Sequence, residues 1–240
     1  MKYMNANELT NEIKLFCNQK ADPASLQKYQ RYFKGGYDGY GLNTTTINNK
    51  VKELIRDYNF SIDTIIDATP ELMESGMYEE TSFALLLLNK FGKDFSHQVF
   101  EIIGTWFSIG ITNWAHADTL GMYILPKFMA KNIIELDSFV SWIDSSYKFQ
   151  RRCVPVTLIK SFKEQRISNL LDFIKPLMND TEREVHQGVG WFLREAWKEN
   201  HSIVENFLLE YKDTAPRLII QYACEKMTKE NKTKYRRVNK

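Results

Sequence analysis

Apolar residues recur along the chain at spacings of three and four, which is the period of an amphipathic helix. The pattern runs through residues 51–58, 95–107 and, most broadly, 182–197. No segment shows the sustained alternation between paired turns that indicates strands. The sequence therefore predicts an all-α protein.

Turn and cap residues divide this pattern into roughly a dozen helices joined by short connections. Asp22 and Pro23 predict a helix that begins with proline at its first position. Thr181 and Glu184 have the spacing of a capping box, which predicts another helix start. Three X-Pro pairs are interpreted as helix junctions: Thr69-Pro70, Leu125-Pro126 and Ala215-Pro216.

A long string of amphipathic helices favours antiparallel pairs stacked into a solenoid. The chain lacks a clean sequence period, so a compact bundle stays as the alternative. We predict one helical-repeat domain over residues 1–228 and a basic C-terminal tail over residues 229–240. From residue 226 onward, seven Lys and Arg stand against the single acid Glu230, and we expect this stretch to be a solvated, frayed end.

Four glycines within residues 35–41 interrupt the helical pattern and permit positive φ angles. The segment lacks the GxxxxGK[ST] pattern of a phosphate-binding loop. We interpret it as a flexible loop between helices, with a DNA-facing position as one alternative.

Composition narrows the class of protein. Apolar residues make up 43% of the chain and are spread along it, which favours a substantial core and argues against disorder. The N-terminus is polar where a signal peptide would be apolar, and Cys17, Cys153 and Cys224 are too widely spaced for a zinc motif. We expect a cytoplasmic protein with reduced thiols. Its net charge of +2 means that any nucleic-acid surface must come from local clustering.

Three groups of residues could carry chemistry. Trp114 and Asp118 are four positions apart and would share one face of a helix. Arg151 and Arg152 suit phosphate binding, and Pro155 after them either bends their helix or marks its first turn. Taken singly, a packed tryptophan, a capping aspartate and a solvated arginine pair are the ordinary interpretations.

Gly188 and Gly190 form the third group, in a segment with helical periodicity. Each costs a helix about 1 kcal/mol relative to alanine. We therefore expect another backbone, either a helix or DNA, to approach closely at these positions. Trp191 would by default belong to the core.

In this order, the groups resemble the DNA alkylation repair proteins that are built from HEAT-like repeats. The W-x-x-x-D and G-W-x-L-R-E patterns are the most specific parts, and the resemblance extends from residue 29 to 226. The matching segments are 32–34 (YFK), 113–118 (NWAHAD), 149–151 (FQR), 190–195 (GWFLRE) and 216–219 (PRLI).

The resemblance implies a right-handed superhelix of degenerate HEAT-like repeats with a concave, cationic DNA-binding face. It implies a monofunctional glycosylase that excises cationic N3- and N7-alkylated purines. Asp118 would be the catalytic carboxylate, Trp114 and Trp191 would frame the sugar of the lesion, and Arg151 would be the active-site arginine.

Further residues are expected at the DNA surface: Tyr32, Lys34, Arg152 and Arg194. The partner implied is duplex DNA containing alkylated bases. We expect the protein to be a monomer and not to bind a membrane. No cofactor or metal is expected, because the four histidines lie in separate segments without ligand spacing.

The sequence also departs from the family. Residues 43–47 (NTTTI) stand where many relatives have a proline and an arginine, and residues 186–188 (HQG) replace a segment with lysine and alanine. Two alternatives stay open, the second of them because the net charge is modest. One is a non-catalytic relative that binds damaged or branched DNA, and the other is a helical scaffold that binds a protein on its concave face.

Overall fold

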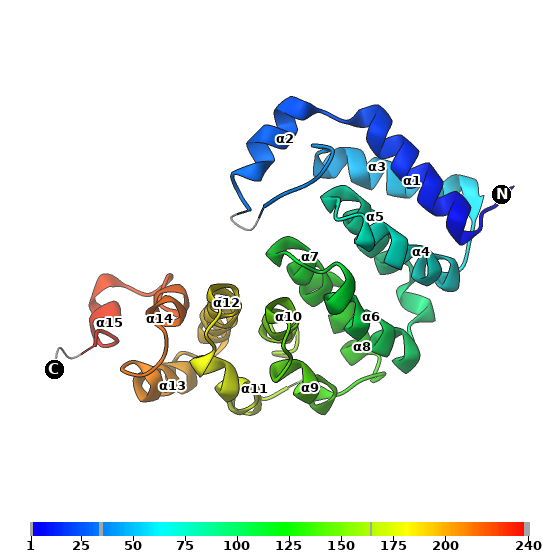
Figure 1. Ribbon diagram of the computed structural model, residues 1–240. Coiled ribbons are helices and arrows are strands. Elements are labelled where there is room, and N and C mark those ends of the chain that lie inside the picture. Colours follow the sequence, from blue (N-terminus) through cyan, green and yellow to red (C-terminus); the bar gives the residue numbers. More distant parts are fainter. Residues whose placement is uncertain (1, 34–35, 164, 238–240) are drawn as a thin grey trace. The chain divides into compact units, whose positions relative to one another are not determined.

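The computed structural model describes residues 2–33, 36–163 and 165–237, and most of that part is helical (Figure 1). The prediction of an all-α fold is confirmed. In the described residues, strand structure is limited to β1 (Lys2–Tyr3) and β2 (Tyr58–Asn59), which pair in parallel. The chain forms two compact units, Met1–His116 and Ala117–Lys240.

The first unit packs around a central helix. Helix α5 is buried on almost every side, and its apolar second half places Phe83, Leu85, Leu87 and Leu88 fully buried against the neighbouring helices. Helices α1, α3 and α4 contact it. The helices of this unit are α1 (Ala6–Lys20), α2 (Pro23–Gln30), α3 (Thr44–Asp57), α4 (Ile62–Glu74), α5 (Tyr78–Leu88), the 3₁₀ segment η1 (Asn89–Asp94), α6 (His97–Ile109) and the start of α7 (Trp114–Thr119).

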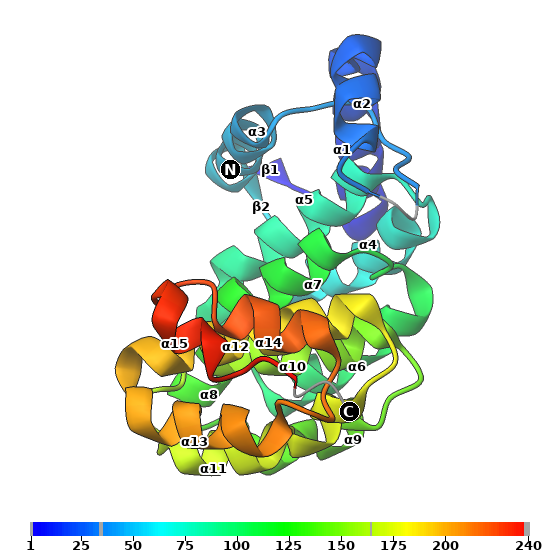
Figure 2. The same cartoon turned by 90° about the vertical axis from the view of Figure 1, so that its left-hand side faces the viewer.

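The second unit has two layers of helices (Figures 1 and 2). Helices α10, α12 and α14 lie side by side in one layer, and α9, α11 and α13 form the other. After α7, the elements are the π-helical turn η2 (Leu120–Ile124), α8 (Leu125–Ala130), η3 (Leu136–Phe139), α9 (Val140–Ile143), α10 (Lys148–Leu158), α11 (Ile167–Ile174), η4 (Lys175–Asn179), α12 (Arg183–Glu199), α13 (His201–Tyr211), α14 (Arg217–Ala223) and α15 (Lys229–Thr233).

The two glycines of α12 explain the tight packing of one layer. A Cβ atom on Gly188 would lie 3.1 Å from Arg152 Cγ on α10, and a Cβ on Gly190 would lie 3.0 Å from the Ile219 carbonyl oxygen on α14. The close approach expected at these glycines is therefore an approach of helices, one on each side.

Several boundaries differ from those predicted. Asp22 caps α2 as expected, since it accepts the Ala24 N–H at 3.0 Å. Thr181 does not cap α12, which begins two residues later; Asp180 accepts the Glu182 N–H instead, at 2.7 Å. The helix junction predicted at Thr69-Pro70 is wrong, because Pro70 lies inside α4, where neighbouring packing outweighs the one lost hydrogen bond. Pro155 lies inside α10 and not in its first turn.

The C-terminal stretch is docked up to residue 237. Tyr235 is fully buried, its carbonyl oxygen accepts a hydrogen bond from Arg217 Nη1 at 2.7 Å, and Arg237 Nη2 donates to the Ala215 carbonyl at 2.9 Å. The expected frayed end is therefore wrong for residues 229–237, because a buried aromatic side chain holds them. Residues 238–240 lie outside the described part.

Candidate active site

The second unit holds a forked ion pair between α7 and α10. Arg152 donates from Nε and Nη2 to the two carboxylate oxygens of Asp118, at 2.8 and 2.7 Å. Its third group, Nη1, donates to the Glu184 carbonyl of α12 at 2.6 Å. Three elements therefore fix the orientation of the Asp118 carboxylate. The bidentate pairing fixes its geometry as well as neutralising its charge.

Burial and charge act on Asp118 in opposite directions. Burial raises the pKa of its carboxyl group above the usual value, while the hydrogen bonds and charge of Arg152 lower the pKa. Both carboxylate oxygens accept from the guanidinium, an arrangement that requires the ionised form. The Asp118 side chain keeps 15% of its surface exposed, so a partly accessible anion results.

Arg152 was expected to contact DNA, but it is only 5% exposed and its donors are directed to Asp118 and Glu184. A phosphate contact would require it to leave these partners. The structure thus gives Arg152 the position of a support for the Asp118 carboxylate.

Arg151 points elsewhere. Its Nε and Nη2 donate to Asp180 at 2.6 and 3.2 Å, and Nη1 donates to the Ser145 carbonyl at 2.6 Å. Consecutive residues on a helix diverge by roughly 100°, so only one of the two arginines can meet Asp118. The arginine beside the predicted catalytic carboxylate is Arg152, one position after the residue chosen from the sequence.

The other predicted residues of this unit lie on α12. Trp191 is half-buried. Arg194 has 19% of its side chain exposed and forms ion pairs with Glu195, at 3.0 Å, and with Glu225. These acids offset its charge, so Arg194 is a weaker phosphate contact than the sequence suggested.

The first unit places Trp114 at the exposed end of an aromatic stack. Trp114 is 41% exposed, and its ring stacks on Phe33 with centroids 5.6 Å apart and an angle of 17°. Phe33 stacks in turn on Tyr37, at 5.0 Å. Tyr32 is 64% exposed, as a surface contact would require, and Lys34 lies outside the described residues.

His116, two positions from Trp114, is a structural residue. It is buried, its Nε2 lies 3.1 Å from the Tyr78 carbonyl oxygen, and its Nδ1 lies 2.8 Å from Asn113 Nδ2. Burial lowers the pKa of His116 to about 3. The ring is therefore neutral at physiological pH.

A buried carboxylate holds the glycine-rich loop, which sequence reasoning missed. Glu79 is fully buried; its Oε1 accepts from the Tyr37 hydroxyl and from the backbone N–H groups of Gly41 and Leu42, at 2.9, 2.9 and 3.0 Å, and its Oε2 accepts from the Tyr40 N–H at 2.8 Å. The expected flexible loop is therefore anchored from residue 37 onward. Its only signal in the sequence is an acid at the start of a helix, which is usually interpreted as a favourable charge at the helix dipole.

The backbone of this loop requires glycine at position 41. Gly41 has a φ of +78°, and a Cβ there would overlap the Asp22 carbonyl oxygen. The loop thus packs its backbone directly against the start of α2.

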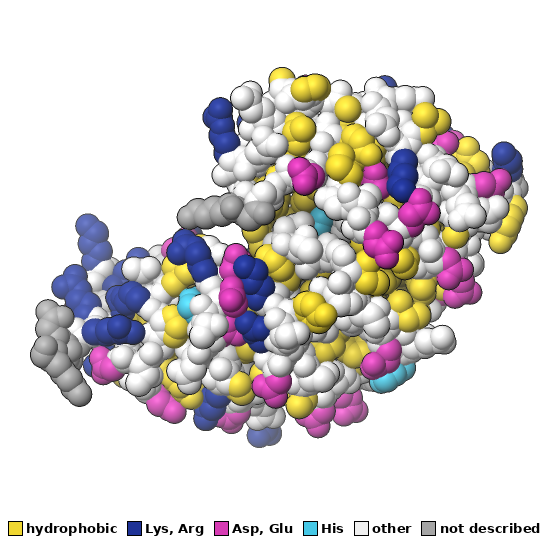
Figure 3. All heavy atoms as spheres, in the orientation of Figure 1, with side chains coloured by type: hydrophobic (Ala, Val, Ile, Leu, Met, Phe, Trp, Pro, Cys, Tyr) yellow, Lys and Arg dark blue, Asp and Glu magenta, His cyan; other side chains and the backbone are white. Residues whose placement is uncertain are grey.

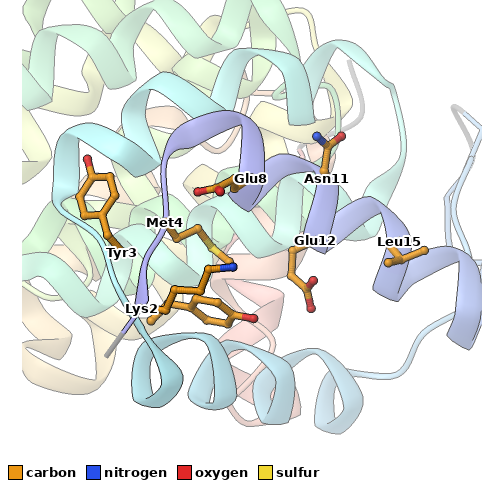
Figure 4. A pocket seen from close by; sticks show the side chains of 8 residues that line it. Lys2, Tyr3, Met4, Glu8, Asn11, Glu12 and Leu15 are labelled. Atoms are coloured by element: carbon orange, nitrogen blue, oxygen red, sulfur yellow. The ribbon is translucent and has the colours of Figure 1, made fainter.

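The first unit also has a surface hollow, which contains none of the predicted site residues (Figure 4). Side chains from residues 2–4, α1 and β2 line it: Lys2, Tyr3, Met4, Glu8, Asn11, Glu12, Leu15 and Tyr58. Over residues 2–33, 36–163 and 165–237, no group of three or more His, Cys, Asp or Glu side chains could hold a metal ion. Within the same ranges, no helix combines the length and apolar character needed to cross a membrane.

Comparison with known proteins places the chain in a family. The sequence profile of the DNA alkylation repair enzyme family matches residues 17–227. A predicted DNA alkylation repair enzyme from Enterococcus faecalis has a similar fold, with a TM-score of 0.74 and 17% identity over 88% of this chain and 98% of that one. The search of curated proteins returned no match. With the profile covering most of its length, the chain belongs to the DNA alkylation repair enzyme family.

Proposed function

We propose that the chain is a monofunctional DNA glycosylase that excises N3- and N7-alkylated purines from duplex DNA. The observation that carries this proposal is the Asp118 carboxylate, which is held as an anion by the fork of Arg152 while part of its surface stays exposed. Family membership supports a role in DNA repair.

The reaction suits a single preoriented carboxylate. Alkylation at N3 or N7 gives the purine a positive charge, so the base leaves as a neutral molecule with the electron pair of the C1′–N bond and needs no general acid. Positive charge then develops on the sugar, and an anion stabilises it. Asp118 would also orient the attacking water, whose oxygen bonds to C1′ and whose proton is released.

Other residues take supporting roles in this proposal. Arg152 positions Asp118, and the guanidinium limits the ways in which the carboxylate can turn. Trp114 and Trp191 present aromatic faces, which attract a cationic sugar or base. Tyr32 would contact the DNA backbone. The protein would act as a monomer in the cytoplasm.

The test is release of 7-methylguanine from methylated duplex DNA by the wild type and by Asp118→Asn. Removing the charge should lower the excision rate by about 10²–10³-fold, the usual effect of losing one transition-state contact. Asp180→Asn is a matched control, because Asp180 forms a buried fork with Arg151 in the same unit. It should reduce stability and leave the excision rate per folded molecule nearly unchanged.

The outcomes separate the alternatives. Equal losses in both variants would mean that Asp118 is only structural. No release by the wild type, together with tight and salt-sensitive DNA binding, would identify a non-catalytic DNA-binding relative. Absence of DNA affinity as well would favour a protein-binding scaffold.

A further inference from the structure

The C-terminal basic segment, residues 226–237, carries more positive charge than the chain as a whole. Six cationic side chains stand against the single acid Glu230, whereas the net charge of the protein is +2. The remaining residues are therefore net acidic. Figure 3 shows Lys and Arg side chains gathered at the end of the second unit that holds α14 and α15. The six are Lys226, Lys229, Lys232, Lys234, Arg236 and Arg237.

The fold holds these charges in place. Buried Tyr235 and the Arg217 hydrogen bond to its carbonyl fix the end of the segment on α14. Lys232 Nζ donates to the Glu225 carbonyl at 3.0 Å, which fixes α15 at its other side. A docked array loses less conformational freedom on binding than a mobile tail would.

Part of the charge is uncompensated. Lys226 lies 3.2 Å from Glu225 and Lys234 lies 3.9 Å from Glu205. In the described part of the chain, Lys229 and Arg236 form no ion pair within 4.0 Å, and both are exposed. These two side chains are the ones best placed to meet an external anion.

We infer that the C-terminal basic segment binds the phosphate backbone of duplex DNA several base pairs away from the lesion. The inference rests on the proposed function for the identity of the polyanion. It commits to DNA over a lipid surface because the apolar side chains of the segment, Met227 and Tyr235, are buried. A membrane-surface segment would present such side chains outward.

The layer of α10, α12 and α14 sets the distance between the Asp118 carboxylate and the C-terminal basic segment. Asp118 pairs with α10, and the segment packs beyond α14. Neighbouring helices are spaced by about 8–10 Å, so three such steps place the segment roughly 25–30 Å from the carboxylate. With 3.4 Å per base-pair step, this corresponds to roughly 7–9 base pairs.

The first experiment measures the salt dependence of duplex binding by fluorescence anisotropy. Each lost phosphate contact lowers the slope of log K against log salt by about 0.9, so Lys229→Gln with Arg236→Gln should lower it by about 1.8. Between 200 and 50 mM salt, the wild type should then gain about 12-fold more affinity than the variant. The control is Lys163→Gln with Arg166→Gln, an exposed lysine and arginine next to α11 in the other layer, which should not change the slope.

A second measurement moves the lesion along the duplex. A 7-methylguanine is placed about 5 base pairs from one end of the duplex or from the other. At only one of the two ends should the difference in salt slope between wild type and variant disappear, because the segment then has no DNA beneath it. Excision at saturating DNA should stay unchanged in the double variant, since neither residue contacts Asp118.

Three results would overturn the inference: an unchanged slope in the double variant, an equal change in the control, or loss of binding to anionic vesicles with no change on DNA. DNA binding without base release would refute the proposed glycosylase activity alone. An altered slope would in that case still support the DNA contact. Excision with an unchanged slope would refute only the contact.

Discussion

The substitution Glu79→Gln tests how the glycine-rich loop is held. Glutamine keeps the shape of the side chain and replaces one oxygen with an NH₂ group. Oε1 accepts three hydrogen bonds and Oε2 accepts one, from the Tyr40 N–H. The amide oxygen would therefore occupy the Oε1 position, and the NH₂ group would oppose the Tyr40 N–H, donor against donor.

The magnitude follows from these four bonds. Hydrogen bonds to a charged group contribute about 1.5–3 kcal/mol and neutral ones about 0.5–1.5, so weakening three costs roughly 3 kcal/mol and losing the fourth roughly 2. Glutamine also avoids the desolvation of a buried charge, which returns part of that sum. We expect the loop to lose about 3 kcal/mol of stability against local opening.

Amide hydrogen exchange measures this local opening. The N–H groups of Tyr40, Gly41 and Leu42 should exchange about 10²-fold faster in the variant, since each 1.4 kcal/mol is a factor of ten. Glu74→Gln, an exposed acid in the same unit, should change nothing. If the three amides keep their protection in Glu79→Gln, the carboxylate does not hold the loop and the reasoning is refuted.

Three more predictions follow from single positions. His116 has a folded-state pKa of about 3, below its ordinary 6.5, so the unfolded chain binds the proton more readily. The contribution of His116 to the free energy of unfolding should be fully present well above pH 6.5 and should fall by about 2 kcal/mol from pH 7 to pH 5, as measured by urea titrations. His116→Gln should remove this fall. Gly188→Ala should push Arg152 away from Asp118 and lower the excision rate about tenfold or more, with DNA affinity unchanged, because its Cβ would lie 3.1 Å from Arg152 Cγ. Gly190→Ala should instead lower the thermal midpoint, because overpacking against α14 costs roughly 1–3 kcal/mol of unfolding free energy. A variant as stable as the wild type would contradict the tight packing inferred there.

Local patterns were sufficient for the helices and for choosing candidate site residues. The periodicity of residues 182–197 predicts α12, and the cost of Gly188 and Gly190 predicts that something packs closely on it. Asp118 could be chosen from its spacing to Trp114 and from the family resemblance. These conclusions depend on residues near one another in the chain.

The structure differs from the sequence-based expectations where distant residues decide the contacts. Arg151 and Arg152 are equivalent in the sequence, and only the packing of α10 against α7 selects Arg152 for Asp118. Glu79 lies 42 positions from Tyr37, and no local pattern links them. The burial of Tyr235 likewise depends on the surface of α14, so composition alone suggested a loose end.

The π-helical turn between α7 and α8 has a consequence for engineering. Its five residues follow Asp118 almost directly, and Gly121 within it packs against Cys153 and Val156 of α10. A π turn holds one residue more than an α turn. The extra residue therefore changes the direction in which side chains before the turn point relative to those after it. Deleting one residue from 120–124 would rotate Asp118 by about 100° relative to α8. The Asp118 side chain would then point away from Arg152 and lose its ion pair, although both residues and their other neighbours were retained.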